Sequence, residues 1–219
     1  MLCADLTGRS ADQVIKVNNI CSINKEKLTF TVYSRSLFGG LTQRYIRSYQ
    51  PAETVYRDKE NHPSVHPKFW YTGDFNGDGK DEVLGISAHE PTGESDYPSM
   101  VFLYDLENDK LLFHKHVMDF KVTLPGTASS DPDDMAANSD RIIIMDCDGD
   151  GKTDIVHIHA KGTTTYTFSG FANGSPDMKV INTEYQNHEE KNHSTRWKYI
   201  LCRDRGFLQS ILSIYRARS

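Results

Sequence analysis

Carboxylate side chains recur at alternate positions in two nine-residue segments of this chain of 219 residues. Segment 74–82 reads Asp-Phe-Asn-Gly-Asp-Gly-Lys-Asp-Glu, and segment 146–154 reads Asp-Cys-Asp-Gly-Asp-Gly-Lys-Thr-Asp. Both fit the pattern D-x-[DN]-x-D-G-K-x-[DE]. Oxygen ligands at positions 1, 3 and 5 of a tight loop converge on one point, and glycine at position 6 permits the sharp turn. Hard oxygen ligands on a flexible loop favour calcium over zinc or copper.

Each loop therefore predicts one Ca2+ site, with side-chain oxygens at positions 1, 3, 5 and 9 and a backbone carbonyl at position 7. The expected ligands of the first site are Asp74, Asn76, Asp78, Lys80 and Glu82. The expected ligands of the second site are Asp146, Asp148, Asp150, Lys152 and Asp154. Three or four carboxylates held this close repel one another without a cation, which is a further reason to expect one.

Two alternative interpretations of these loops are weaker. A single segment of this kind could be an Asp/Gly-rich hairpin turn, but two full matches in one chain make that coincidence improbable. An EF-hand places a glutamate at position 12 between two helices. Position 12 is Gly85 in the first loop and His157 in the second, and the flanks 68–71 and 83–86 have the composition of strands. We therefore expect each loop to join two β-strands.

The charge of the chain is concentrated in these loops. The formal net charge is −5, from 30 acidic and 25 basic residues. Each loop holds four acids and one base, so the rest of the chain is almost neutral. This balance favours neither a nucleic-acid partner nor binding to a membrane surface. The longest clear apolar run is 142–145, so no membrane span is expected.

Cysteine, histidine and serine patterns carry less information. The four cysteines contain no CxxC pair, which favours buried free thiols and leaves one or two bridges open. The pairs His114/His116 and His157/His159 each share one face of a strand, where exposed polar residues are a simpler interpretation than metal ligands. No GxSxG, HExxH or phosphate-binding motif occurs, so a hydrolase remains an alternative without a local signature.

The elements that must position the loops are β-strands. Short segments rich in Val, Ile, Thr, Tyr and Phe recur between Gly, Asn, Asp and Pro, and no helical stripe extends over three turns. Trp70 and Tyr71 are expected to pack between sheets rather than to stack on sugars. Segments 51–67 and 124–139 are expected to be long loops. The predicted strands are 13–17, 28–33, 43–48, 69–72, 82–87, 100–106, 111–117, 141–145, 154–159, 163–169, 178–183, 196–201 and 211–216.

Two weaker copies of the loop indicate an internal repeat. Segments 5–14 and 202–211 align without gaps on 74–83, so the copies begin 69, 72 and 56 residues apart. Arg9 replaces a ligand in the first copy, and Cys202 and Gly206 replace ligands in the last. We expect these outer copies to keep the turn and the following strand but to hold no metal.

Segment 73–83 resembles an FG-GAP/VCBS repeat, the calcium-loop repeat of integrin-α-type β-propellers, and is similar to propeller regions of bacterial Rhs- and Tc-toxin-like surface proteins. The resemblance implies one repeat per antiparallel four-stranded blade, with calcium in a loop between neighbouring strands. We thus expect an all-β fold, a partial or small β-propeller of about three to four four-stranded antiparallel blades. The chain is expected to be one domain, 1–219, with repeat units 1–67, 68–139, 140–195 and a partial unit 196–219.

The resemblance implies a calcium-binding module for binding or adhesion, or a scaffold of a larger secreted or surface protein, and a bacterial source is expected. Calcium is expected to be structural, and the partner is expected to be a protein or a glycan. A lectin-like propeller and a propeller hydrolase are the alternatives. Closed propellers have about four to eight blades, so we expect the chain to belong to a larger propeller, to self-associate, or to form an unusually small ring.

Overall fold

A computed structural model of the chain describes residues 1–9, 12–22, 25–36, 38–49, 67–88, 98–122, 140–159, 162–185, 199–204 and 207–212. These residues form three antiparallel four-stranded sheets, one two-stranded hairpin and a single 3-10 helix. The fold is therefore all-β, as the strand pattern predicts. Within the described ranges, no helix is long and apolar enough to cross a membrane.

Each sheet is a meander of strands that follow one another in the chain. The first sheet consists of β1 (Leu2–Ala4), β2 (Gln13–Ser22), β3 (Lys25–Arg35) and β4 (Leu41–Tyr49). The second consists of β5 (Pro67–Gly73), β6 (Glu82–Ser87), β7 (Met100–Asp105) and β8 (Lys110–His116). The third consists of β9 (Arg141–Met145), β10 (Asp154–His159), β11 (Gly162–Ser169) and β12 (Asp177–Tyr185). Helix η1 (Phe171–Asn173) precedes β12, and the hairpin consists of β13 (Tyr199–Asp204) and β14 (Phe207–Leu212).

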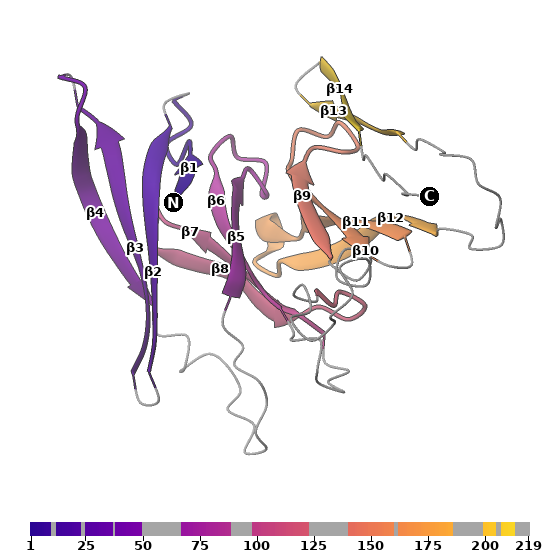
Figure 1. Cartoon of the computed structure of the whole chain (residues 1–219), viewed down its shortest axis with the longest axis horizontal. Coiled ribbons are helices and arrows are strands. Elements are labelled where there is room, and N and C mark those ends of the chain that lie inside the picture. The colour runs from indigo at the N-terminus through magenta and orange to yellow at the C-terminus, as the bar shows by residue number, and fades with distance from the viewer. Residues whose placement is uncertain are drawn as a thin grey trace, which may run out of the picture.

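The three sheets stand side by side in chain order, with the second between the other two (Figure 1). Their first strands are neighbours, because β5 contacts β1 on one side and β9 on the other.

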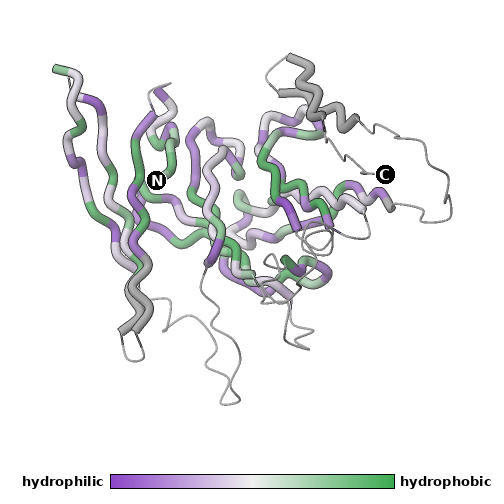
Figure 2. The backbone as a smooth tube through the Cα atoms, viewed as in Figure 1, coloured by the Kyte–Doolittle hydropathy of each residue, from purple (hydrophilic) through white to green (hydrophobic). Residues whose placement is uncertain are grey.

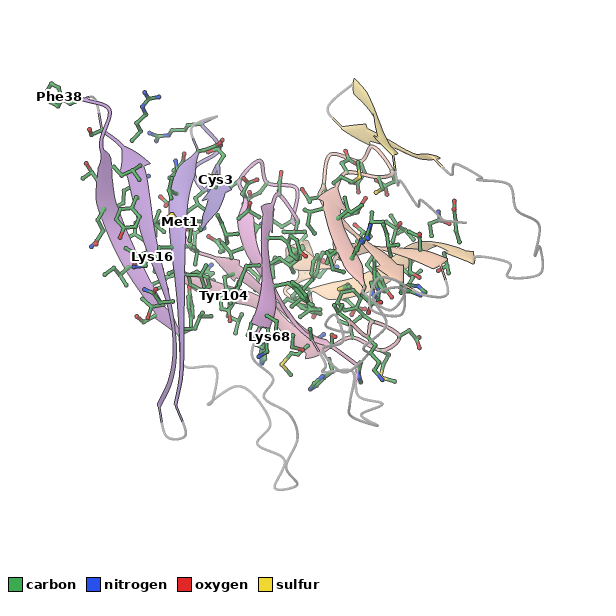
Figure 3. All side chains as sticks on the ribbon, in the orientation of Figure 1. Met1, Cys3, Lys16, Phe38, Lys68 and Tyr104 are labelled. Carbon is green, nitrogen blue, oxygen red and sulfur yellow. The ribbon has the colours of Figure 1, made fainter. Side chains whose placement is uncertain are left out.

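The first interface is an aromatic core between the first and second sheets. Alternate residues of β7, namely Met100, Phe102 and Tyr104, join Ile15 and Phe30 of the first sheet in one buried cluster. The Phe30 ring centroid lies 5.1 Å from that of Tyr104. Tyr104 lies between the sheets, and the hydropathy alternates along the strands of the first sheet (Figures 2 and 3).

The second interface uses the other residues of the same strands. Val101 and Leu103 of β7 pack with Ile155 of β10 and with Tyr166 and Phe168 of β11. Because successive side chains of a strand point to opposite faces, the second sheet supplies apolar groups to both interfaces. This explains why every residue of β6 is buried and why β7 is an almost continuous apolar run.

Trp70 and Tyr71 of β5 divide between the two interfaces in the same way. Trp70 packs against the cluster that contains Phe30, and Tyr71 packs against the cluster that contains Phe168. The expectation that these two aromatic side chains fill space between sheets is confirmed.

Several details differ from the sequence-based expectations. The short strand β1 was not predicted. The last loop copy is wrong in register, because β13 extends to Asp204 and β14 begins at Phe207, so only two residues separate them where the alignment expects a longer loop. This copy has Cys202 at position 1, in place of the aspartate that organises the loops 74–82 and 146–154. Of the two expected long loops, residues 51–66 and 124–139 lie outside the described part of the chain.

The expected burial of the cysteines is also partly wrong. Cys3 is an exposed free thiol, and Cys147 is only half-buried. Cys3 lies on β1, an edge strand of the first sheet. The side chains of Cys21 and Cys202 lie outside the described residues.

Candidate metal centres

Three equivalent loops connect the first two strands of the three sheets. Residues 5–12, 74–81 and 146–153 each join a first strand to a second strand, and the residue that opens the second strand is position 9 of the repeat. In every copy the side chain at position 9 is buried and accepts a hydrogen bond from the N–H at position 2. The donor and acceptor residues are Leu6 and Gln13 (2.8 Å), Phe75 and Glu82 (3.0 Å), and Cys147 and Asp154 (2.8 Å).

In the first loop, Asp74 organises the turn. Its Oδ1 accepts from the N–H of Gly77 at 2.7 Å and its Oδ2 accepts from the N–H of Gly79 at 2.9 Å. Gly77 and Gly79 have φ values of 80° and 84°, in the left-handed region that favours glycine. Asn76 Oδ1 accepts from the N–H of Asp78 at 2.8 Å. The residues at positions 1 and 3 thereby hold the loop in a tight coil.

The second loop repeats this geometry. Asp146 Oδ1 accepts from the N–H of Gly149 at 2.7 Å, and its Oδ2 accepts from the N–H of Gly151 at 3.0 Å. Asp148 Oδ1 accepts from the N–H of Asp150 at 3.0 Å. The two sequence matches thus correspond to the same hydrogen-bond framework.

Glu82, the position-9 residue of the first loop, is buried and well satisfied. Its side chain is 2% exposed. Glu82 Oε2 accepts from the N–H of Phe75, and Oε1 accepts from the Asn76 amide Nδ2 at 2.6 Å. Burial raises the pKa of Glu82 to about 9, and the Asp78 carboxylate adds to the effect, whereas the Phe75 N–H opposes it.

Asp154, the position-9 residue of the second loop, is buried but only half satisfied. Its exposed fraction is 0%, and Oδ2 accepts from the Cys147 N–H. Among the described residues, Oδ1 has no hydrogen-bond partner. Burial raises the pKa of Asp154 to about 6, against the effects of the Cys147 hydrogen bond and of the nearby Thr167 hydroxyl, whose Oγ1 is itself buried without a hydrogen bond of good geometry. An unpartnered carboxylate oxygen inside a protein is costly unless it has a compensating charge.

The second loop also brings three carboxylates together. One oxygen from each of Asp146, Asp148 and Asp154 lies within 4.8 Å of the others, the one such group of acidic, histidine or cysteine side chains in the described ranges. Asp150 instead forms an ion pair with Lys152. Slight burial raises the pKa of Asp150, but its contacts with Lys152 more than offset this, so the pKa falls below its usual value.

The three loops pack against one another. The carbonyl of Asp74, in the 74–82 loop, accepts from the N–H of Thr153, in the 146–154 loop, at 2.7 Å. The carbonyl of Asp5, in the N-terminal loop, accepts from the N–H of Asp81, in the 74–82 loop, at 2.9 Å. In both cases position 1 of one copy bonds to position 8 of the next. Gly73 allows the close approach, because a Cβ there would lie 2.6 Å from Thr153 Cγ2. The two candidate metal centres are therefore neighbours in the fold.

Of the ten expected ligand residues, the structure brings the carboxylates of Asp146, Asp148 and Asp154 together in one group. Lys80 and Lys152 occupy position 7, where the expected ligand is a backbone carbonyl. Sequence reasoning missed the difference between the loops. The loops differ in residue type at positions 3 and 9, and only Asn76 has a side-chain N–H that donates to the carboxylate at position 9.

One histidine expectation is wrong. His157 is only 3% exposed, and its ring packs at 5.2 Å from Phe120. Its Nε2 lies 3.4 Å from Asp140 Oδ2. The segment that contains Phe120 covers this face of β10, so the residue does not face solvent. His114 and His116 are exposed on β8, as expected.

A comparison of this chain with protein-family models, with curated proteins and with solved structures found no match.

Proposed function

We propose that this protein is a calcium-binding module in which the loops 74–82 and 146–154 hold structural Ca2+. The observation that carries the proposal is the group Asp146, Asp148 and Asp154, whose oxygens lie within 4.8 Å of one another. Asp154, a member of this group, also has a buried oxygen, Oδ1, without a hydrogen-bond partner among the described residues. A hard divalent cation would satisfy that oxygen and neutralise the charge of the group. The ligand atoms are all oxygens, which suits calcium better than zinc or copper.

We further propose that the three sheets are blades of a β-propeller related to the FG-GAP/VCBS repeats. Three meandering four-stranded sheets, with neighbouring first strands and with equivalent loops between the first and second strands, support this architecture. Ring closure would require further blades. These would come either from the remainder of a longer chain or from a second copy.

The proposed role is binding, adhesion or scaffolding in a secreted or surface protein, with a protein or a glycan as the partner. Loops of this type bind calcium at roughly 0.1–1 mM outside cells, which suits an extracellular location. Phe38, at the tip of the β3–β4 hairpin, is 99% exposed and points away from the sheets (Figure 3), so Phe38→Ala is a first variant for testing contact with a protein partner.

Thermal unfolding with and without calcium tests the metal proposal. At about 1 mM free calcium, a site with a Kd of roughly 0.1–1 mM stabilises the folded state by about 0.4–1.4 kcal/mol. We expect the wild-type midpoint to fall when EDTA replaces calcium. Asp146→Asn should remove a large part of that difference. Asp177→Asn, which changes an exposed acid on β12, should keep it. An unchanged wild-type midpoint in EDTA would contradict the proposal.

Solution mass tests the architecture. Sedimentation of the 24.9 kDa chain in calcium and in EDTA distinguishes a monomer from a closed pair. A calcium-dependent dimer supports ring closure between copies. A monomer supports a chain whose remaining blades lie elsewhere, and a ladder of larger oligomers would contradict both forms of closure.

A further inference from the structure

We propose that the two loops are unequal calcium sites and that the 146–154 loop binds calcium more tightly. In the 74–82 loop, Asn76 donates a hydrogen bond to Glu82, and this bond replaces part of the interaction that a cation would make with that carboxylate. This inference rests on the proposed calcium function and adds a ranking of its two sites. It follows from the contacts at positions 3 and 9, which are the only ligand positions where the two loops differ in residue type.

The first step concerns the 74–82 loop. Asn76 donates from Nδ2 to Glu82 Oε1 at 2.6 Å, and its own N–H contacts Glu82 Oε2 at 3.3 Å. Together with the Phe75 N–H, these donors reach both oxygens of the buried carboxylate. A cation that enters this loop gains less from Glu82, because Glu82 is already hydrogen-bonded within the protein.

The second step concerns the 146–154 loop. Asp148 stands where Asn76 stands in the other loop and has no side-chain N–H with which to reach the position-9 carboxylate. Asp154 has a buried oxygen without a hydrogen-bond partner in the described part of the chain. Asp148 also adds a negative charge to the group. A cation gains here both an unused ligand atom and a larger Coulomb attraction.

The third step concerns the backbone framework, which does not depend on metal-binding side chains. The N-terminal loop keeps the hydrogen bond between positions 2 and 9 with neutral Gln13 at position 9, whose Oε1 accepts from the Leu6 N–H at 2.8 Å. Its Asp5 Oδ1 accepts from the N–H groups of Thr7 and Arg9. Single Asn/Asp exchanges at position 3 should thus change calcium affinity without unfolding the loop.

Isothermal titration of the full chain with CaCl2 tests the inference. We expect two sites in wild type, separated by at least about tenfold in Kd, since ligand charge tunes such loops over several decades. Asp146→Asn should abolish the tighter site, and Asp74→Asn should abolish the weaker one. Asn76→Asp should tighten the weaker site by about tenfold, and Asp148→Asn should weaken the tighter site by a similar factor.

Asn173→Asp is the matched control, because it adds the same charge at an exposed residue of η1 outside both loops. It should leave both Kd values unchanged, and far-UV circular dichroism should show that every variant is folded. Equal sites in wild type, or loss of the tighter site in Asp74→Asn, would overturn the ranking while leaving the calcium function intact. Absence of calcium binding in wild type at about 10 mM would overturn the proposed function and the ranking together.

Discussion

At the residue scale, the two loops show how one functional group changes a buried site. Asn76 and Asp148 have the same size and the same position in the loop, and both accept a hydrogen bond from the N–H two residues on. Only Asn76 can also donate to the carboxylate at position 9. A carboxylate oxygen that is buried without a partner destabilises the fold unless a nearby charge compensates for it.

Asp154 is proposed to stabilise the calcium-bound protein and to destabilise the metal-free one, and this predicts the behaviour of Asp154→Asn. In saturating calcium, the variant should melt below wild type, because it loses a charged ligand and about tenfold or more in affinity. In EDTA it should melt at the wild-type midpoint or above it, because a neutral amide replaces a buried carboxylate that has an unpartnered oxygen. Calorimetric melting in the two buffers checks the sign. Equal destabilisation in both would show that Asp154 acts only through packing.

At the element scale, close approach between strands and turns holds the sheets together. Gly85 of β6 lies opposite Trp70 of β5. A Cβ at Gly85 would lie 2.8 Å from Trp70 Cζ3 and 3.1 Å from Pro67 Cβ. The absent side chain at this position therefore makes room for an indole that packs against the first sheet.

Gly85→Ala should accordingly lower the free energy of unfolding by about 1–3 kcal/mol, the usual cost of overpacking. Gly40→Ala is the control, because the nearest atom to a Cβ there is Ser36 Oγ at 3.7 Å. This control should stay within about 0.5 kcal/mol of wild type. Urea unfolding measures both variants, and a Gly85→Ala protein as stable as the control would show that Trp70 moves aside freely.

Polar contacts join β4 to the turn between β7 and β8. Arg47 donates from Nε to the Leu106 carbonyl at 2.9 Å and from Nη2 to the Glu107 carbonyl at 3.2 Å. Tyr45 donates to Glu107 Oε2 at 2.9 Å, and the Arg47 guanidinium lies 4.5 Å from the Tyr45 ring centroid. The guanidinium fork thus spans two successive carbonyls of the second sheet.

Arg47→Lys should lower the free energy of unfolding by about 1 kcal/mol, because an ammonium group keeps the charge but cannot reproduce the fork. Arg44→Lys, on the same strand but exposed, should have almost no effect. The comparison uses urea unfolding. Equal stability of the two variants would show that the two hydrogen bonds from Arg47 to the carbonyls add little to stability beyond the positive charge of the side chain.

At the scale of the whole molecule, the second sheet belongs to both hydrophobic cores. Residues 100, 102 and 104 of β7 enter one core and residues 101 and 103 enter the other. Because β7 contributes side chains to both cores, unfolding of the second sheet would expose apolar surface on the first and on the third sheet. We expect the three sheets to unfold as one cooperative unit.

Truncation of a core side chain in the first or in the third sheet tests whether the three sheets unfold together. Phe30→Ala in the first sheet and Phe168→Ala in the third should each cost about 3–5 kcal/mol, because both rings are fully buried. Each variant should show a single transition by fluorescence and by circular dichroism. Two separated transitions in either variant would mean that the affected sheet unfolds independently of the other two.

Much of this molecule can be predicted from local sequence. Most strands are recognised because they are short, apolar and bounded by turn residues. The loops 74–82 and 146–154 are recognised because their chemistry is contained within nine consecutive residues. The structure places strands on both sides of each loop, as predicted from the flanks. The weaker copy at 5–14 also has a turn and the following strand, and it shares with 74–83 an aspartate at positions 1 and 8 and a glycine at position 4.

Other properties depend on contacts between residues far apart in the chain, which local sequence does not determine. The burial of His157 follows from Phe120 packing over β10. Both faces of the second sheet are buried because the sheet packs between the first and third sheets. The sequence by itself determined the oxygen ligands and their spacing, because these are local. Only the tertiary structure decided that Glu82 is satisfied while Asp154 keeps an unpartnered oxygen, because burial and hydrogen bonding depend on how the loops pack.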